Sequence, residues 1–194
     1  MLEQRIQQHF FDSADLKYAS VDLLSRPIHD AVNTLLGSIT SGGKLLICGQ
    51  GGAALLAQHA AALFVGPFER ERPALAALAL GADAGLLGLP GLGWSQLVAN
   101  QVQALGHPGD VLLALATDGA AAAELLPALA AAHDKEMAAV VLTGQDHLAL
   151  TQALAETDVC VTIPHTRRAR ILEAQLMVLH SLCDAVDLQL LGDH

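Results

Sequence analysis

Basic residues are scarce in this chain. Its 194 residues include 10 Lys and Arg against 20 Asp and Glu, which gives a formal net charge of -10. So few cations cannot form a large basic face, and the only run of them is Arg167, Arg168 and Arg170. The composition predicts no direct binding of nucleic acid, so any effect on DNA would pass through another protein.

Cysteines are few and are not spaced as ligands. Cys48, Cys160 and Cys183 lie inside apolar runs, and no two of them form a C-x-x-C pair. This pattern argues against a disulfide framework or a zinc knuckle and is typical of a reducing compartment. We therefore expect a cytoplasmic protein.

The hydrophobicity pattern of the sequence also shows neither a leader segment nor a membrane-spanning segment. Residues 1–8 carry Glu3 and Arg5 and have no apolar core, so no signal peptide is expected. The stretch poorest in charge, residues 74–94, contains Asp83, five glycines and Pro90, and makes a poor spanning helix. No membrane association is predicted.

Apolar residues, by contrast, are abundant. They make up 53% of the chain, enough to offset the conformational entropy lost on folding, so disorder is excluded. A length of 194 residues fits one domain, or one domain with an appendage.

The first 40 residues differ in pattern from the rest. Their apolar positions recur every three to four residues, which predicts helix, and Ser25-Arg26-Pro27 could break it into two helices. From Lys44 onward, short buried runs alternate with helical segments. The predicted strands are 45–48, 76–80, 111–115, 138–142 and 159–163; the predicted helices are 53–65, 95–105, 120–132, 147–156 and 167–190. This alternation predicts an α/β fold with a parallel sheet and helices on both faces.

In such a sheet, ligands bind beyond the carboxyl ends of the strands. The loop after the first predicted strand reads CGQGGA, from Cys48 through Gly51 and Gly52 to Ala53. Its glycines would let backbone amides and a helix N-terminus approach an anion. Alone, this turn is also typical of a plain connection between strand and helix.

Several motifs further along the chain, taken together with this Gly-rich turn, indicate a protein family. In order they are FERERP at 68–73, QVQALGHPGDVL at 101–112, LTG at 142–144, ARI at 169–171 and LCD at 182–184. Together they resemble the sugar isomerase (SIS) domain family, in the branch that holds phosphoheptose isomerases and the initiator-associating proteins called DiaA. The resemblance implies a three-layer α/β/α sandwich with a five-stranded parallel sheet. It also implies a homotetramer, with helices in 1–40 at the subunit contacts and the SIS domain in 41–194.

In phosphoheptose isomerases, the resemblance implies four side chains that hold zinc and move a proton between C1 and C2 of the sugar. His59 and His180 match the two histidines, whereas Leu63 and Leu172 stand in place of a glutamate and a glutamine. Two imidazoles fall short of the three protein ligands of a catalytic zinc. We expect no cofactor; if the chain is an enzyme, His180 is catalytic and His59 and His180 bind zinc weakly.

The phosphate cradle implied by the family has changed as well. Where the family has STSGNS, this chain reads ATDGAA from Ala116 to Ala121, so that Asp118 replaces a serine and opposes a phosphate dianion. Polar groups expected in 81–94 are replaced by apolar ones. The residues predicted to remain as a vestigial ligand site are Gly51, Gly52, Ala53, Thr117, Asp118 and Gly119.

The first hypothesis is therefore a non-catalytic scaffold resembling DiaA. The resemblance implies that it binds the replication initiator DnaA and promotes initiation of chromosomal replication. The acidic net charge suits a partner with a basic surface. The symmetry of a tetramer would repeat each weak contact and so raise the overall affinity. Leu190 and Leu191 near the C-terminus are candidate partner contacts, or else they are buried against a neighbouring subunit.

Two other hypotheses stay open. The chain could be a phosphoheptose isomerase that interconverts sedoheptulose 7-phosphate and a mannoheptose 7-phosphate. It could also be a sensor that binds an uncharged or nucleotide-linked sugar derivative in a crevice lined by Asp83, Asp118, His59 and His180. The charged residues 69–72 are interpreted as a solvated or intersubunit ion-pair cluster. Arg167, Arg168 and Arg170 near the start of the last helix could meet an anion, but they are interpreted as solvated residues of the helix surface.

Overall fold

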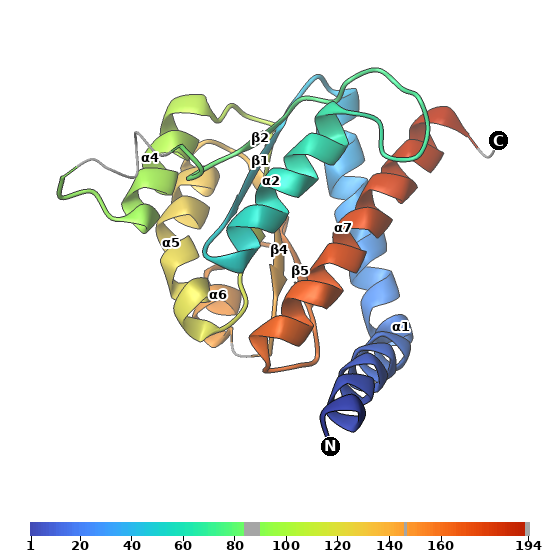
Figure 1. The fold of residues 1–194 in the computed structure, drawn as a ribbon. Coiled ribbons are helices and arrows are strands. Elements are labelled where there is room, and N and C mark those ends of the chain that lie inside the picture. The colour runs from blue at the N-terminus through green and yellow to red at the C-terminus, as the bar shows by residue number, and fades with distance from the viewer. Residues whose placement is uncertain (84–89, 146, 193–194) are drawn as a thin grey trace.

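The computed structural model describes residues 1–83, 90–145 and 147–192 and has a five-stranded sheet at its centre (Figure 1). All four strand pairings are parallel, in the order β2-β1-β3-β4-β5. The strands are β1 Leu45–Gly49, β2 Ala77–Ala79, β3 Val111–Leu115, β4 Ala138–Thr143 and β5 Val159–Thr162. Each of the five predicted runs forms a strand, which confirms the α/β prediction.

Helices cover both faces of this sheet. They are α1 Leu2–Thr40, α2 Gly52–Val65, α4 Trp94–Leu105, α5 Gly119–Asp134, α6 Leu148–Ala153 and α7 Arg168–Leu191. Figure 1 shows α1, α2 and α7 on one side of the strands and α4, α5 and α6 on the other. Within the described part of the chain, no helix is both long and apolar enough to cross a bilayer.

The two sides of the sheet form separate apolar cores because strand side chains alternate in direction. In β1, Leu45 and Ile47 join the core under α1, α2 and α7, whereas Leu46 and Cys48 join the core under α4 and α5. Every residue of β1 and β3 is buried, which explains why these strands appear as uninterrupted apolar runs in the sequence.

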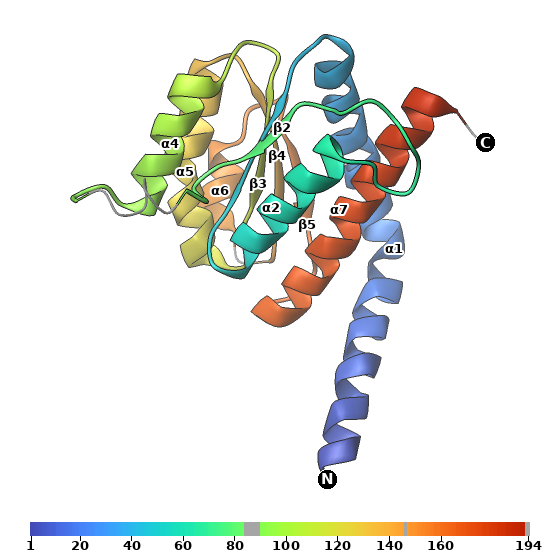
Figure 2. The same ribbon diagram turned by 45° about the horizontal axis from the view of Figure 1, so that its top comes forward.

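The prediction that Pro27 divides the N-terminal region into two helices is wrong, because α1 runs unbroken from Leu2 to Thr40. Proline removes the bond that the Leu23 carbonyl would accept, but Leu23 lies on the exposed side of the helix, where water can replace it. Figure 2 shows the N-terminal half of α1 projecting from the body as an arm, while the C-terminal half packs against α7 and the sheet.

The topology places two helix N-termini at one edge of the sheet. After β1 the chain crosses to β2, and β3 then lies on the opposite side of β1, so the order reverses between β1 and β3. The last residues of these strands, Gly49 and Leu115, are paired in register. Because α2 begins just after β1 and α5 just after β3, both helices begin at this reversal point, where open α/β sheets bind ligands.

Candidate functional site

A crevice of about 260 Å³ lies at this reversal point. It is formed by the loop before α2, the loop before α5 and the first turns of α7. The residues that line it are Gln50, Gly51, Gly52, Thr117, Asp118, Ala120, Ala121, Arg168 and Leu172. Four of the predicted ligand residues, Gly51, Gly52, Thr117 and Asp118, are thus brought together, whereas Ala53 and Gly119 do not line the cavity.

The N-terminus of α2 is open toward the crevice. Gly51 precedes the helix at φ 62° and ψ −126°, a backbone conformation that glycine adopts without strain, and it offers no side chain to cap the helix. The amides of Ala53 and Ala54 bond back to the carbonyls of Gln50 and Gly51. Among the described residues, the amides of Gly51 and Gly52 meet no acceptor, so this end of the helix can receive an anion.

The N-terminus of α5, in contrast, has a side-chain cap, Asp118. Its Oδ1 accepts a hydrogen bond from the Ala121 amide at 3.0 Å, and its Oδ2 accepts one from the Thr117 hydroxyl at 3.3 Å. The Ala121 amide, and with it the guanidinium of Arg168, holds the pKa of Asp118 below its ordinary value despite partial burial. The carboxylate is therefore ionised at neutral pH.

Arg168 changes the electrostatics expected from the sequence. Its Nε forms an ion pair with Asp118 Oδ2, so the crevice contains a paired carboxylate rather than an isolated one. The repulsion of a phosphate dianion that Asp118 alone would cause is accordingly reduced. Sequence reasoning missed this role because the two residues are fifty positions apart; the one available signal was the place of Arg168 at the start of the last helix.

Leu172 closes one side of the crevice. A Cβ atom added to Gly52 would lie 2.7 Å from Leu172 Cδ1, so a larger residue at position 52 would displace the end of the Leu172 side chain. The resemblance places a polar ligand at position 172. The structure instead has an apolar side chain packed partly into the core.

A second functional group lies further along the same contact between α2 and α7. The Nε2 atoms of His59 and His180 are 3.1 Å apart, so the two rings share a hydrogen bond, and the ring of Phe68 packs 5.3 Å from that of His180. Helical rise puts His59 about 10 Å along α2 from Gly52. The structure thus brings the two predicted imidazoles together, at some distance from the crevice.

These residues do not fit the zinc site that the family resemblance implies. Leu63, one turn after His59, packs against the core, and Leu172 does the same on α7. No group of three or more His, Cys, Asp and Glu that could hold a metal occurs in residues 1–83, 90–145 and 147–192. Two imidazoles alone lack the third protein ligand of a catalytic zinc, so the described residues do not form a catalytic zinc site.

The other end of α2 is held by a buried ion pair. Arg72 and Asp187 have side chains only 1% and 3% exposed, with Nε and Oδ1 2.5 Å apart. The guanidinium also donates to the carbonyls of Leu63 and Phe64, the last turn of α2, at 2.7 and 2.8 Å. The interpretation of Arg72 as a solvated or intersubunit charge is wrong, because α7 supplies a buried partner.

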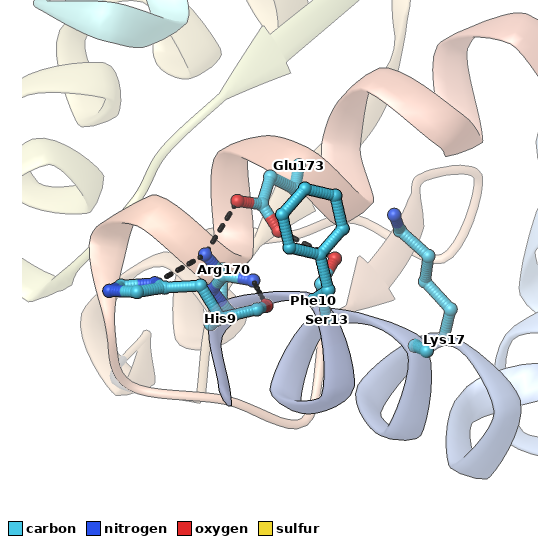
Figure 3. A pocket seen from close by; sticks show the side chains of 7 residues that line it. His9, Phe10, Ser13, Lys17, Arg170 and Glu173 are labelled. Atoms are coloured by element: carbon cyan, nitrogen blue, oxygen red, sulfur yellow. Dashed lines mark hydrogen bonds and ion pairs between the residues drawn. The ribbon is translucent and has the colours of Figure 1, made fainter. Parts of the chain in front are cut away.

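A larger cavity, of about 510 Å³, lies outside this region, between α1 and the start of α7. Figure 3 shows Arg170 reaching toward α1, where it donates to the His9 carbonyl at 2.9 Å and pairs with Glu173 at 2.7 Å. Arg170 is 4% exposed, so its interpretation as a solvated helix-surface residue is also wrong. Its contacts join the α1 arm to α7 rather than form part of the crevice.

The remaining predicted site residues lie apart from the crevice. Leu190 and Leu191 are each 37% exposed at the C-terminal end of α7, where Arg70 donates to the Gly192 carbonyl. Asp83, His59 and His180 do not line the crevice with Asp118 as the sensor hypothesis requires. Residues 84–89, part of the segment with missing polar groups, lie outside the described residues.

Comparison with known proteins agrees with this architecture. A family model described as "SIS domain" matches residues 9–144. The chain is 56% identical over 195 residues to a phosphoheptose isomerase of Methylibium petroleiphilum, covering 100% of this chain and 97% of that protein. It is similar to the structures of phosphoheptose isomerases from Neisseria gonorrhoeae (TM-score 0.88, 36% identity, 96% of this chain and 99% of that one covered) and Francisella tularensis (0.90, 34%, 96% and 98%).

Proposed function

This chain belongs to the SIS domain family, and from that premise we propose that it binds a phosphorylated sugar, the substrate class named for its relatives, at the crevice. The observation that carries this proposal is the N-terminus of α2, which has no side-chain cap and whose residues Gly51 and Gly52 line the same cavity as Arg168. Helix N-terminal amides together with an arginine are suited to a phosphoryl group.

The sugar chain would then extend along the contact of α2 with α7 toward His59 and His180. An extended seven-carbon chain is of the same order of length as the roughly 10 Å between Gly52 and His59. An isomerisation takes a proton from one carbon next to the carbonyl group and returns it to the neighbouring carbon, while a hydroxyl proton moves between the two oxygens. An imidazole can accept and return such protons, and His180 is the candidate base.

We expect turnover to be slow compared with an isomerase that has a carboxylate base. Leu63 and Leu172 supply neither a base nor a metal ligand, and a positioned general acid or base contributes about 10²–10⁴-fold in rate. Binding depends on different residues, those of the crevice, so binding and turnover are separable in this chain.

The test measures both properties. Isothermal titration with sedoheptulose 7-phosphate is expected to show binding that Arg168→Ala weakens and that unphosphorylated sedoheptulose does not reproduce. Isomerisation, followed by product analysis with and without zinc, is expected to be slow and to be abolished by His180→Ala. Absence of binding of the phosphorylated sugar to the wild-type chain would overturn the proposal.

A non-catalytic scaffold that binds the replication initiator DnaA is the second candidate function. The observation that favours it is the combination of apolar residues at two positions where the family has polar ones, Leu63 and Leu172, with the exposed leucines at the end of α7. Exposed leucines at a helix end form a contact that a partner protein could cover.

A pull-down of DnaA separates this candidate from the first. The double variant Leu190→Ala with Leu191→Ala should lose the partner, while Leu148→Ala, which removes a leucine 72% exposed on α6, should retain it. No retention of DnaA by the wild-type chain, or equal retention by the double variant, would contradict the assignment of the helix end.

Both candidates would act as a homotetramer, which we infer from the arm of α1. Its first half exposes large apolar side chains to solvent in the single chain; they include Leu2, Ile6, Phe10 and Phe11. Subunit contacts would remove them from water. Light scattering after size exclusion is expected to give four copies, and a monomer at micromolar concentration would contradict this assembly.

A further inference from the structure

Asp118 is held by the same kinds of donor that an anionic ligand would use. Its carboxylate accepts from the Ala121 amide and the Thr117 hydroxyl and pairs with Arg168. A helix N-terminal amide, a hydroxyl and a guanidinium are also the donors that proteins direct at phosphoryl oxygens. The Ala121 amide, the Thr117 hydroxyl and the Arg168 guanidinium are therefore already engaged by an anion of the protein itself.

We propose that Asp118 is a built-in anion that confines the anionic group of a ligand to the α2 side of the crevice and competes with it for Arg168. This inference rests on the proposed function and deepens it, because it names the residue that limits how tightly the crevice binds a phosphoryl group. The α2 side is the one whose helix N-terminus has no side-chain cap.

The exposure of the two charged side chains separates their roles. Asp118 is 20% exposed and is fixed by a backbone amide of its own helix, whereas Arg168 is 71% exposed. Arg168 is therefore the member of the pair that can turn toward another anion. Because Gly51, Gly52 and Arg168 line the same cavity, a phosphoryl group on α2 would share the guanidinium with Asp118.

The charge state of Asp118 persists at neutral pH. The Ala121 amide, followed by Arg168, keeps the pKa of its carboxyl below the ordinary value. Of the charged groups that face it, Arg168 at the start of α7 is the one that lines the crevice. Competition for Arg168 is therefore a constant property of the crevice near pH 7, rather than one that a small change of pH removes.

The test titrates the full chain with inorganic phosphate. Asp118→Asn retains a side-chain oxygen to cap α5 and removes only the charge, and Asp118→Ser is a second, shorter replacement. Both are expected to bind phosphate at least about tenfold more tightly than the wild type, because an ionised neighbour has been removed. Asp184→Asn is the matched control; it removes the same charge from an exposed site on α7 and should leave the affinity unchanged.

Arg168→Ala extends the test. It is expected to weaken phosphate binding more in the Asp118→Asn background than in the wild type. In that background the Arg168 guanidinium has no carboxylate partner at position 118 and can bind the phosphate alone. Such non-additivity is the signature of two groups that share a partner. Equal losses in the two backgrounds would contradict the competition.

The outcomes distinguish this inference from the proposed function. Folded Asp118→Asn and Asp118→Ser proteins that bind phosphate no more tightly than the wild type would overturn the inference. If the wild type then still binds sedoheptulose 7-phosphate, the proposed function stands. If only the Asp118 variants bind either compound, the built-in anion is supported and the proposed function of the wild-type chain fails.

Discussion

The two helices that begin at the crevice, α2 and α5, start in different ways. Gly51 precedes α2 and leaves its first amides free, whereas Asp118 precedes α5 and accepts from the amide of Ala121. One helix start is thus prepared for an outside anion and the other contains an anion already. Similarity of fold to an isomerase therefore does not determine how many phosphoryl contacts the crevice offers.

At the C-terminal ends of α2 and α5 the contrast is reversed, because there α2 is the helix that is held by a charged side chain. The last turn of α2 is held by the buried pair Arg72 and Asp187, while α5 ends at the exposed Asp134 and is followed by the half-buried Lys135 and the exposed Glu136. The helix that is open at the crevice is thus the one secured by a buried charge at its other end. Substitutions at the four ends test this comparison.

The largest effect is expected for Asp187→Ala. It leaves the Arg72 guanidinium buried without its counter-charge, and removing one partner of a buried pair costs about 3–5 kcal/mol in the free energy of unfolding. Urea denaturation measures this loss. Asp184→Ala, an exposed change on the same helix, should alter stability little, and similar losses for both variants would show that the buried pair is not what holds this end.

Gly51→Ala should have the next largest effect. Nothing lies within 4 Å of an added Cβ, so the cost comes from the backbone conformation alone, about 1–3 kcal/mol. Gly52→Ala is its counterpart, because there the backbone is helical and the added atom meets the movable end of Leu172. Thermal unfolding should rank Gly51→Ala as the more destabilising variant, and the reverse order would contradict a requirement for glycine at position 51.

Asp118→Ala removes the cap of α5 and is expected to lower stability by about 1 kcal/mol. Asp118→Asn, which can still accept from the Ala121 amide, should lose less. Chemical denaturation of both variants at pH 7 measures the difference. If alanine and asparagine were equivalent, the hydrogen bond at the start of α5 would contribute nothing to stability.

Glu136→Gly is expected to raise stability slightly. Glu136 has φ 56°, and it donates to the His133 carbonyl while Met137 donates to that of Ala132, the arrangement that ends many helices at a glycine. Glycine relieves the strain of this conformation, a gain of up to about 1 kcal/mol. A lower melting temperature for the variant would show that the Glu136 side chain stabilises the helix end.

The smallest effect is a pH dependence. Because the pKa of Asp118 is lowered in the folded state, its contribution is present above the ordinary value of 3.8 and is lost as the pH falls through the lowered value. The difference in melting temperature between wild type and Asp118→Asn should therefore shrink below about pH 4. Other carboxylates titrate in both proteins and cancel, so a difference that persists at low pH would contradict the assignment.

The sheet could be predicted from the sequence because its central strands are buried on both faces and appear as five-residue apolar runs. The helix bounds followed from the same alternation to within two residues, except at α6, where the predicted helix was longer. The break predicted at Pro27 was wrong because the rule that proline interrupts a helix does not consider whether the carbonyl four residues earlier is open to water. A proline on an exposed side leaves its carbonyl partner to water.

The candidate site was predictable only in part. The Gly-rich turn and the resemblance identified Gly51, Gly52, His59 and His180, which the structure places along the contact of α2 with α7. The pairing of Arg168 with Asp118 was not predicted, because the sequence alone indicates a solvated helix surface for Arg168 and a charge that opposes a phosphate for Asp118. Their meeting depends on the tertiary fold, which brings the start of α7 to the end of the sheet where α5 begins, and no local pattern contains that information.

The buried pair of Arg72 and Asp187 also determines how the crevice could widen. It joins α2 to α7 at the end remote from Gly51, so we expect any separation of these helices at the crevice to be a rotation about that end. The 14 residues of α2 form a lever about 20 Å long, and a tilt of a few degrees displaces the glycines by roughly 1 Å. A charge pair outside the crevice thus marks the end about which we expect the mouth of the crevice to widen.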